Sequence, residues 1–93
     1  MSESTPEIEV YASRFCPYCH WARGLLDSKE VSYRLYDVDK DFSLRKEMME
    51  RSQRTSVPQI FINGRHIGGF DDLSALDREG KLDPFLAEKA AAD

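Results

Sequence analysis

The chain has 93 residues, of which 41% are hydrophobic and 32% are charged, and its formal net charge is −4. This length supports one small domain with a single hydrophobic core, which we expect to span residues 1–93 with an ordered part over about 8–88. The excess of acidic residues, with no cluster of lysines and arginines, argues against a nucleic-acid partner.

The first half of the chain alternates between strand and helix periodicity. Apolar alternation predicts a strand over Ile8–Ala12, and helical spacing predicts a helix over about Pro17–Lys29, with proline at its first position. A second strand over Ser32–Asp37 and a second helix, opened by the capping residues Asp39–Ser43, follow. The expected buried side chains of the two helices are Ala22, Leu25, Leu26, Leu44, Met48 and Met49. This order implies a parallel strand pair with a right-handed crossover.

The pattern then changes to an antiparallel hairpin. A strand over Gln59–Ile62 is followed by Asn63-Gly64, which is the strongest short hairpin turn, and by a returning strand over Arg65–Gly68.

Two further helices complete the expected fold. Asp71 and Asp72 are expected to cap a third helix that ends at Gly80, and Pro84 is expected to open a last short helix. The predicted fold class is therefore α/β, with βαβ followed by ββα and a four-stranded mixed sheet flanked by helices on both faces.

The two cysteines lie where the first strand meets the first helix. Unpaired N–H groups and the helix dipole stabilise a thiolate at Cys16, and Arg14 adds a positive charge nearby. Cys19 lies one turn further into the helix, where its side chain is more covered. We therefore expect Cys16 to attack a disulfide and Cys19 to resolve the mixed disulfide. A disulfide between cysteines so close in sequence constrains little of the unfolded chain. We therefore do not expect the pair to form a structural disulfide.

The cysteine pair has three other interpretations. A zinc site would need His20 and His66 as further ligands, and His20 would point round the helix from Cys19. Cys16 to His20 also matches the c-type haem attachment pattern, but haem attachment would need export, an axial ligand and a large cavity. Two plain packing cysteines would not need Pro-Tyr between them at a helix entrance.

Two loops could hold a ligand. Ser56-Val57-Pro58 is either a plain strand entrance or a functional loop, in which a cis bond would free the Val57 backbone to face another chain. Gly69 lets the backbone approach a ligand, and the helix N-terminus that follows favours a carboxylate. A helix cap needs only one aspartate, so the second aspartate of Asp71-Asp72 is available to a ligand. It indicates a ligand that carries an ammonium group in addition to the carboxylate.

In these motifs, the chain resembles a dithiol glutaredoxin of the thioredoxin-like superfamily. The resemblance runs from about Ile8 to Phe85, nearly the whole chain. Its specific stretches are Cys16–Cys19, Thr55–Ile62 and Ile67–Leu73. Three such stretches in this order, on the expected elements, are far more specific than any one alone.

The resemblance implies that the ligand is glutathione. It implies that Val57, next to cis-Pro58, pairs its backbone with the cysteine of glutathione, and that Arg54 faces the glycyl carboxylate. Similar proteins commonly carry a lysine where this chain has Ser13. Either Arg14 supplies the missing positive charge at the side of the glutathione groove, or that positive charge is weaker in this chain. The implied glutathione-binding residues are Arg14, Tyr18, Arg54, Ser56, Val57, Pro58, Gly69, Phe70, Asp71 and Asp72.

The expected function is glutathione-dependent thiol–disulfide exchange on protein–glutathione mixed disulfides and on protein disulfides, through Cys16 and Cys19. Glutathione would be a co-substrate, with no tightly bound cofactor. The alternative is a module that binds an iron–sulfur cluster with glutathione as co-ligand, against which Pro17 argues. A thioredoxin-type reductant is disfavoured, because the Gly69–Asp72 turn has no purpose there.

The remaining expectations concern location and assembly. No apolar run approaches the length of a membrane span, and the polar, acidic N-terminal residues are unlike a signal peptide. We therefore expect a cytoplasmic monomer with no membrane partner, whose partners are glutathione and glutathionylated or disulfide-containing proteins.

Overall fold

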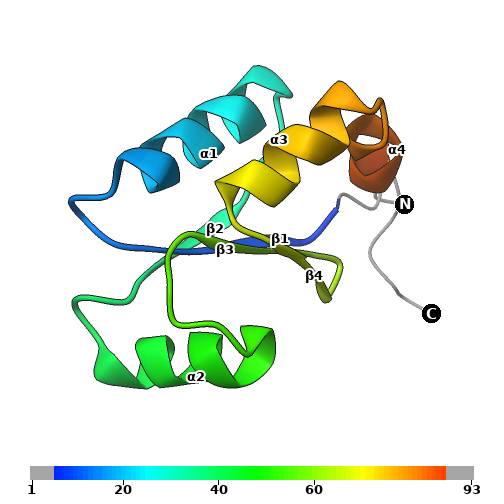
Figure 1. The fold of residues 1–93 in the computed structure, drawn as a ribbon. Coiled ribbons are helices and arrows are strands. Elements are labelled where there is room, and N and C mark those ends of the chain that lie inside the picture. The colour runs from blue at the N-terminus through cyan, green and yellow to red at the C-terminus, as the bar shows by residue number, and fades with distance from the viewer. Residues whose placement is uncertain (1–5, 88–93) are drawn as a thin grey trace, which may run out of the picture.

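The computed structural model describes residues 6–87, so residue 88, the expected end of the ordered part, lies outside it. One four-stranded sheet lies between helices (Figure 1). Within residues 6–87, no helix is long and apolar enough to cross a membrane. In chain order the elements are β1 (Ile8–Ala12), α1 (Pro17–Ser28), β2 (Arg34–Asp37), α2 (Phe42–Ser52), β3 (Gln59–Ile62), β4 (Arg65–Gly68), α3 (Phe70–Arg78) and α4 (Leu82–Ala87).

The strand order β2-β1-β3-β4 confirms the predicted mixed sheet. Val10 of β1 pairs with Leu35 of the parallel strand β2 and with Ile60 of the antiparallel strand β3. The β3–β4 hairpin turns at Asn63 and Gly64, whose φ angles of 52° and 81° lie in the left-handed region that this turn requires.

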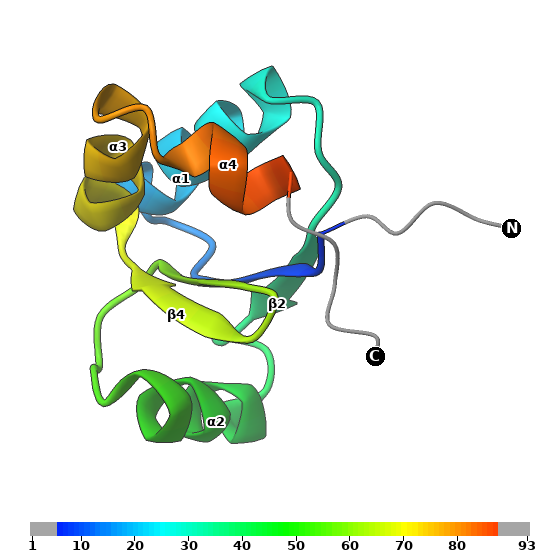
Figure 2. The ribbon, with the colours of Figure 1, turned by 90° about the vertical axis from the view of Figure 1, so that its right-hand side faces the viewer.

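Helices cover both faces of the sheet. Helices α1, α3 and α4 pack on one face, and α2 packs on the other (Figures 1 and 2). Strand β1 therefore has a buried side chain on each face, with Val10 in the larger core and Tyr11 in the core under α2, both fully buried. Covering both faces explains why the two central strands, β1 and β3, are almost wholly buried.

The starts of two helices, α3 and α4, differ from the predictions. The N-cap residue of α3 is Gly69, so the expectation that Asp71 caps this helix was wrong, whereas Asp72 caps it from inside the first turn. Asp72 lies at the third helical position and reaches back to the Gly69 N–H, which is the geometry of a capping box. Helix α4 begins at Leu82, two residues before Pro84, because the first turn of a helix tolerates a residue without an N–H.

Arg51 docks α2 onto the sheet. Its guanidinium lies 4.0 Å from the centre of the Phe61 ring, donates to the Tyr11 hydroxyl at 2.7 Å, and pairs with Glu9 at 3.1 Å. Helix α2 then ends at Gln53 in the left-handed region. The loop over residues 54–58 starts from this fixed point and runs to the cysteine pair.

Candidate active site

Cys16 is the N-cap residue of α1. Its Sγ accepts a hydrogen bond from the Cys19 N–H at 3.1 Å, as the side chain of a serine or aspartate does at other helix caps. Pro17 occupies the first helical position, and the first turn has no acidic residue to repel a negative charge on sulfur. The Cys16 sulfur therefore lies at the N-terminal, positive end of the α1 dipole.

Both cysteines are free thiols, but they differ in environment. Cys16 is partly exposed, whereas Cys19 is 2% exposed. Burial raises the pKa of the Cys19 thiol to about 12, and the hydrogen bond with Cys16 adds to the rise. Cys16 is therefore the thiol that an external disulfide can reach, and Cys19 is held protonated behind it.

The loop before β3 brings its backbone to the reactive sulfur. The Val57–Pro58 peptide bond is cis, and the Val57 carbonyl oxygen lies 3.8 Å from Cys16 Sγ. Gln59, which is fully buried, donates from Nε2 to the Ser56 carbonyl at 3.0 Å and contacts His66 through its Oε1 at 2.7 Å. These contacts tie the loop to β4.

The N-terminus of α3 faces the same loop. Asp72 accepts hydrogen bonds from the Gly69 N–H at 3.0 Å and from Arg54 at 3.1 Å. Burial opposes ionisation of Asp72, but the hydrogen bonds from Arg54 and Gly69 outweigh it and lower the pKa of this carboxyl. Gly68, with φ of 124°, packs so closely on this carboxylate that a Cβ would collide with it.

Between this loop and α3 lies a groove of about 250 Å³, which we call the Val57 groove. The aromatic rings of Tyr18, Trp21 and Phe70 cluster at its side, with Tyr18 and Trp21 centroids 5.2 Å apart. The groove is lined by Tyr18, Arg54, Ser56, Val57, Pro58, Gln59, Gly69, Phe70, Asp71 and Asp72. The structure thus brings together every residue expected to bind glutathione except Arg14.

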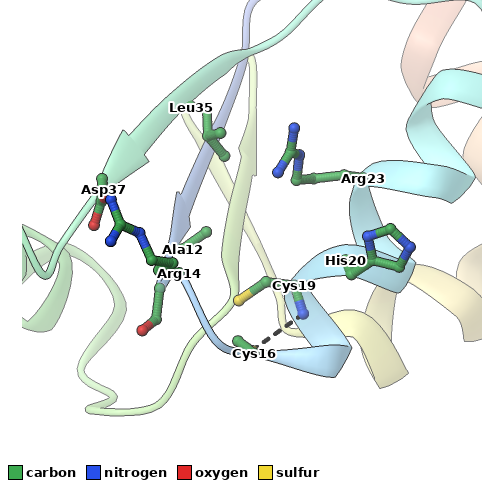
Figure 3. A pocket seen from close by; sticks show the side chains of 9 residues that line it. Ala12, Arg14, Cys16, Cys19, His20, Arg23, Leu35 and Asp37 are labelled. Carbon is green, nitrogen blue, oxygen red and sulfur yellow. Dashed lines mark hydrogen bonds between the residues drawn. The ribbon is translucent and has the colours of Figure 1, made fainter.

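Arg14 lines a second pocket of about 250 Å³ at the other side of the cysteine pair. Figure 3 shows Arg14, from the loop after β1, and Arg23, from α1, extending toward β2, with the sulfur of Cys19 facing the same space. The pocket is lined by Ala12, Ser13, Arg14, Cys16, Cys19, His20, Arg23, Leu35 and Asp37. We call it the Arg14–Arg23 pocket.

The lining residues that were not expected at these sites from the sequence include Gln59, His20 and Arg23. Gln59 is a polar residue inside an apolar strand, and that contrast was the available signal. His20 and Arg23 follow Cys16 and Cys19 at helical spacing, which places all four on one face of α1.

The two histidines considered as zinc ligands lie in different surroundings. His20 lines the Arg14–Arg23 pocket, and His66 contacts Gln59 on β3. Over residues 6–87, no group of three or more His, Cys, Asp or Glu side chains could hold a metal ion.

The family model and the relatives found by comparison with known proteins all point to the same family. The family model for glutaredoxin matches residues 8–67. Glutaredoxin 3 of Escherichia coli K12 is 54% identical over 79 residues, which cover 85% of this chain and 95% of that protein. A probable glutaredoxin of Synechocystis is 47% identical over 81 residues, covering 86% of this chain and 92% of that protein.

The solved structures that resemble this fold belong to the same family. The dithiolic glutaredoxin 2-C-Grx1 of Trypanosoma brucei brucei aligns with a TM-score of 0.80 and 42% identity over 87% of each chain. A buckwheat glutaredoxin–glutathione complex aligns with a TM-score of 0.81 and 28% identity, over 87% of this chain and 76% of that one. The fold is therefore thioredoxin-like, as expected. The chain belongs to the glutaredoxin family, and it is a dithiol enzyme of the thiol–disulfide oxidoreductase class.

Proposed function

We propose that the protein uses glutathione to reduce protein–glutathione mixed disulfides and protein disulfides. One observation carries the proposal: the capped sulfur of Cys16 lies 3.8 Å from the Val57 carbonyl, at the end of a groove with charged groups of both signs. Glutathione is a peptide with two carboxylates and one ammonium group, so it needs such a groove.

The γ-glutamyl end of glutathione fits the N-terminus of α3. The unpaired N–H groups there favour its carboxylate. Asp72 is already engaged by Gly69 and Arg54, whereas the Asp71 carboxylate forms no hydrogen bond or ion pair with residues 6–87. Asp71 is therefore the acid available to the ammonium group.

The other end of glutathione fits the opposite side of the groove. The backbone of Val57 is placed to pair with the cysteinyl residue. Arg54 lines the groove and Arg14 does not, so we assign the glycyl carboxylate to Arg54. Its side chain is 48% exposed and can turn from Asp72 toward a second carboxylate.

The reaction begins when the Cys16 thiolate attacks the glutathione sulfur of a protein–glutathione disulfide. A Cys16–glutathione disulfide forms, the original bond breaks, and the protein leaves as a thiolate that takes a proton. A second glutathione then attacks the bound glutathione sulfur, which releases oxidised glutathione and restores the Cys16 thiolate. Overall, one free glutathione is consumed, the substrate cysteine is released as a thiol, and the two glutathione units leave joined in one disulfide.

A protein disulfide takes a second route through Cys19. Cys16 first forms a mixed disulfide with one substrate cysteine. Cys19 then attacks Cys16 Sγ, and the proton of the Cys19 thiol passes to the leaving substrate thiolate. The substrate leaves as a dithiol, and the enzyme is left with a Cys16–Cys19 disulfide. Glutathione can reduce this disulfide, because enzymes of this class have potentials of about −200 to −230 mV, near that of the glutathione pool.

We also propose that the protein acts as a monomer. Electrons come from glutathione, so the scheme requires no tightly bound cofactor. We place the protein in the cytoplasm, where glutathione keeps the pair reduced.

The proposal is tested by supplying electrons from two sources. Turnover of a small glutathionylated disulfide is measured with glutathione and glutathione reductase, and then with thioredoxin reductase alone. We expect rapid turnover only with glutathione. Equal or faster turnover with thioredoxin reductase would contradict the proposal.

A further inference from the structure

The Arg14–Arg23 pocket is not used by the glutathione scheme above. It shares no lining residue with the Val57 groove, yet it contains both cysteines of the pair. Its charged and titratable lining groups, apart from the cysteines, are Arg14, His20, Arg23 and Asp37.

The two arginines leave donors free. Among residues 6–87, the Arg14 guanidinium forms no hydrogen bond or ion pair, although its backbone N–H donates to Asp39 at 3.2 Å. Arg23 donates from Nε to the Tyr33 hydroxyl at 3.4 Å, which leaves its two terminal nitrogens available. An arginine presents its nitrogens in a fork that matches a carboxylate.

Asp37 offsets only part of this positive charge. One of its carboxylate oxygens accepts hydrogen bonds from the N–H groups of Asp39 and Lys40, at 2.9 and 3.3 Å. It is thereby engaged in the turn after β2. Once Cys16 is bonded to a substrate sulfur, two arginines against one aspartate give the pocket a net positive charge.

The position of the pocket indicates what kind of molecule reaches it. Cys16 lines the pocket, and its Sγ also lies 3.8 Å from Val57, which lines the groove. A polypeptide joined to Cys16 Sγ is longer than glutathione, so it must continue past the sulfur in both directions. One of these directions leads to the Arg14–Arg23 pocket, where Leu35 is 43% exposed and offers apolar contact.

We propose that the Arg14–Arg23 pocket binds an acidic side chain of a polypeptide substrate, close in sequence to the cysteine that Cys16 attacks. This proposal rests on the function proposed above and adds a preference among protein substrates. An exposed ion pair at such a site changes a rate by about two- to five-fold.

The test uses short peptides whose single cysteine is joined to 2-thiopyridine. The Cys16 thiolate attacks the peptide sulfur and forms a Cys16–peptide disulfide. The bond to the pyridine sulfur breaks, and 2-thiopyridone leaves with the electron pair, takes a proton and is followed by its absorbance. No glutathione is present, so any charge preference belongs to the peptide.

Peptides with Asp or Asn on either side of cysteine are compared in matched pairs. For at least one side, we expect the Asp peptide to react about two- to five-fold faster with the wild-type protein. Arg14→Gln should remove this ratio, Arg23→Gln should reduce it, and Arg14→Lys should restore part of it. Added salt should shrink it.

Arg78→Gln is the matched control, because it removes the same charge from α3, where Arg78 contacts Ser74. It should leave the ratio unchanged. Equal rates for Asp and Asn peptides on both sides, or a ratio that survives Arg14→Gln and Arg23→Gln, would overturn the proposal. If glutathione-coupled turnover remained intact in the same preparation, the proposed function would stand. Loss of that turnover in the wild type would contradict the function itself.

Discussion

The carbonyl oxygen of Val57 lies 3.8 Å from the sulfur of Cys16, although 40 residues separate the two positions in the chain. Cys16 is fixed by the start of α1, and Val57 is fixed by the loop that α2 and β3 hold between them. A group that forms a disulfide with Cys16 therefore lies next to the backbone of Val57. Hydrogen bonds to that backbone can align an incoming peptide.

Replacing the attacking sulfur should stop all thiol transfer. Cys16→Ser removes the one thiol that is both partly exposed and capped by a helix N–H. We expect no turnover with glutathionylated peptides or protein disulfides in the glutathione reductase assay. Residual activity above a few per cent would show that Cys16 is not the nucleophile.

Replacing the buried sulfur should separate the two activities. Cys19→Ser leaves the Cys16 thiol and the Val57 groove in place, so removal of glutathione from a protein should continue with a second glutathione as resolving thiol. Reduction of a protein disulfide should be lost, because no neighbouring thiol attacks Cys16 Sγ. Parallel assays of both substrates measure the split, and simultaneous loss of both activities would contradict it.

The buried thiol should also make stability depend on alkaline pH. The pKa of Cys19 is about 12 in the folded protein because of burial, against about 8.5 for an ordinary thiol. A raised pKa stabilises the fold below about pH 8.5, and this stabilisation is lost as pH rises toward 12. Between about pH 8 and 10, the free energy of unfolding should fall further in the reduced wild type than in Cys19→Ser, by on the order of 1–2 kcal/mol.

Denaturant unfolding of both proteins under reducing conditions measures this difference. Tyr11, whose pKa burial also raises to about 12, is present in both proteins, so its contribution cancels. Identical pH slopes would show that Cys19 titrates in the folded state as it does in the unfolded chain.

Arg54 should govern the apparent affinity for glutathionylated substrates. Arg54→Gln removes the cation of the Val57 groove, and we expect the KM to rise about two- to five-fold, with kcat changing little. The difference should shrink at high salt. Lys81→Gln is a control, because Lys81 pairs with Glu79 beyond the groove. An unchanged KM for Arg54→Gln would remove Arg54 from the site.

The local sequence predicted the elements better than the direction of side chains. The position of Cys16 before Pro17 is a local pattern, so the helix cap could be predicted. Arg14 is different, because Asp39 accepts from the Ser13 hydroxyl and the Arg14 N–H and thereby fixes the loop that carries it. A contact between positions 25 residues apart leaves no trace in the pattern around the cysteines.

The N-cap residue of α3 was predicted wrongly for a similar reason. Two aspartates at a helix start indicate a cap, but the backbone of Gly69 is extended and the Asp72 side chain turns back to it. The contact of Gln59 with His66 likewise depends on the register of β3 and β4. Such relationships are set by tertiary geometry, which local propensity does not encode.

The central claim is that glutathione lies in the Val57 groove while it is bonded to Cys16. The most direct measurement is NMR of the Cys16–glutathione disulfide in the Cys19→Ser protein, with NOEs recorded between glutathione and the protein. We predict NOEs from the γ-glutamyl protons to Phe70 and Asp71, and from the cysteinyl protons to Val57. NOEs to Arg14, His20 and Arg23, with none to Val57 or Phe70, would contradict the account.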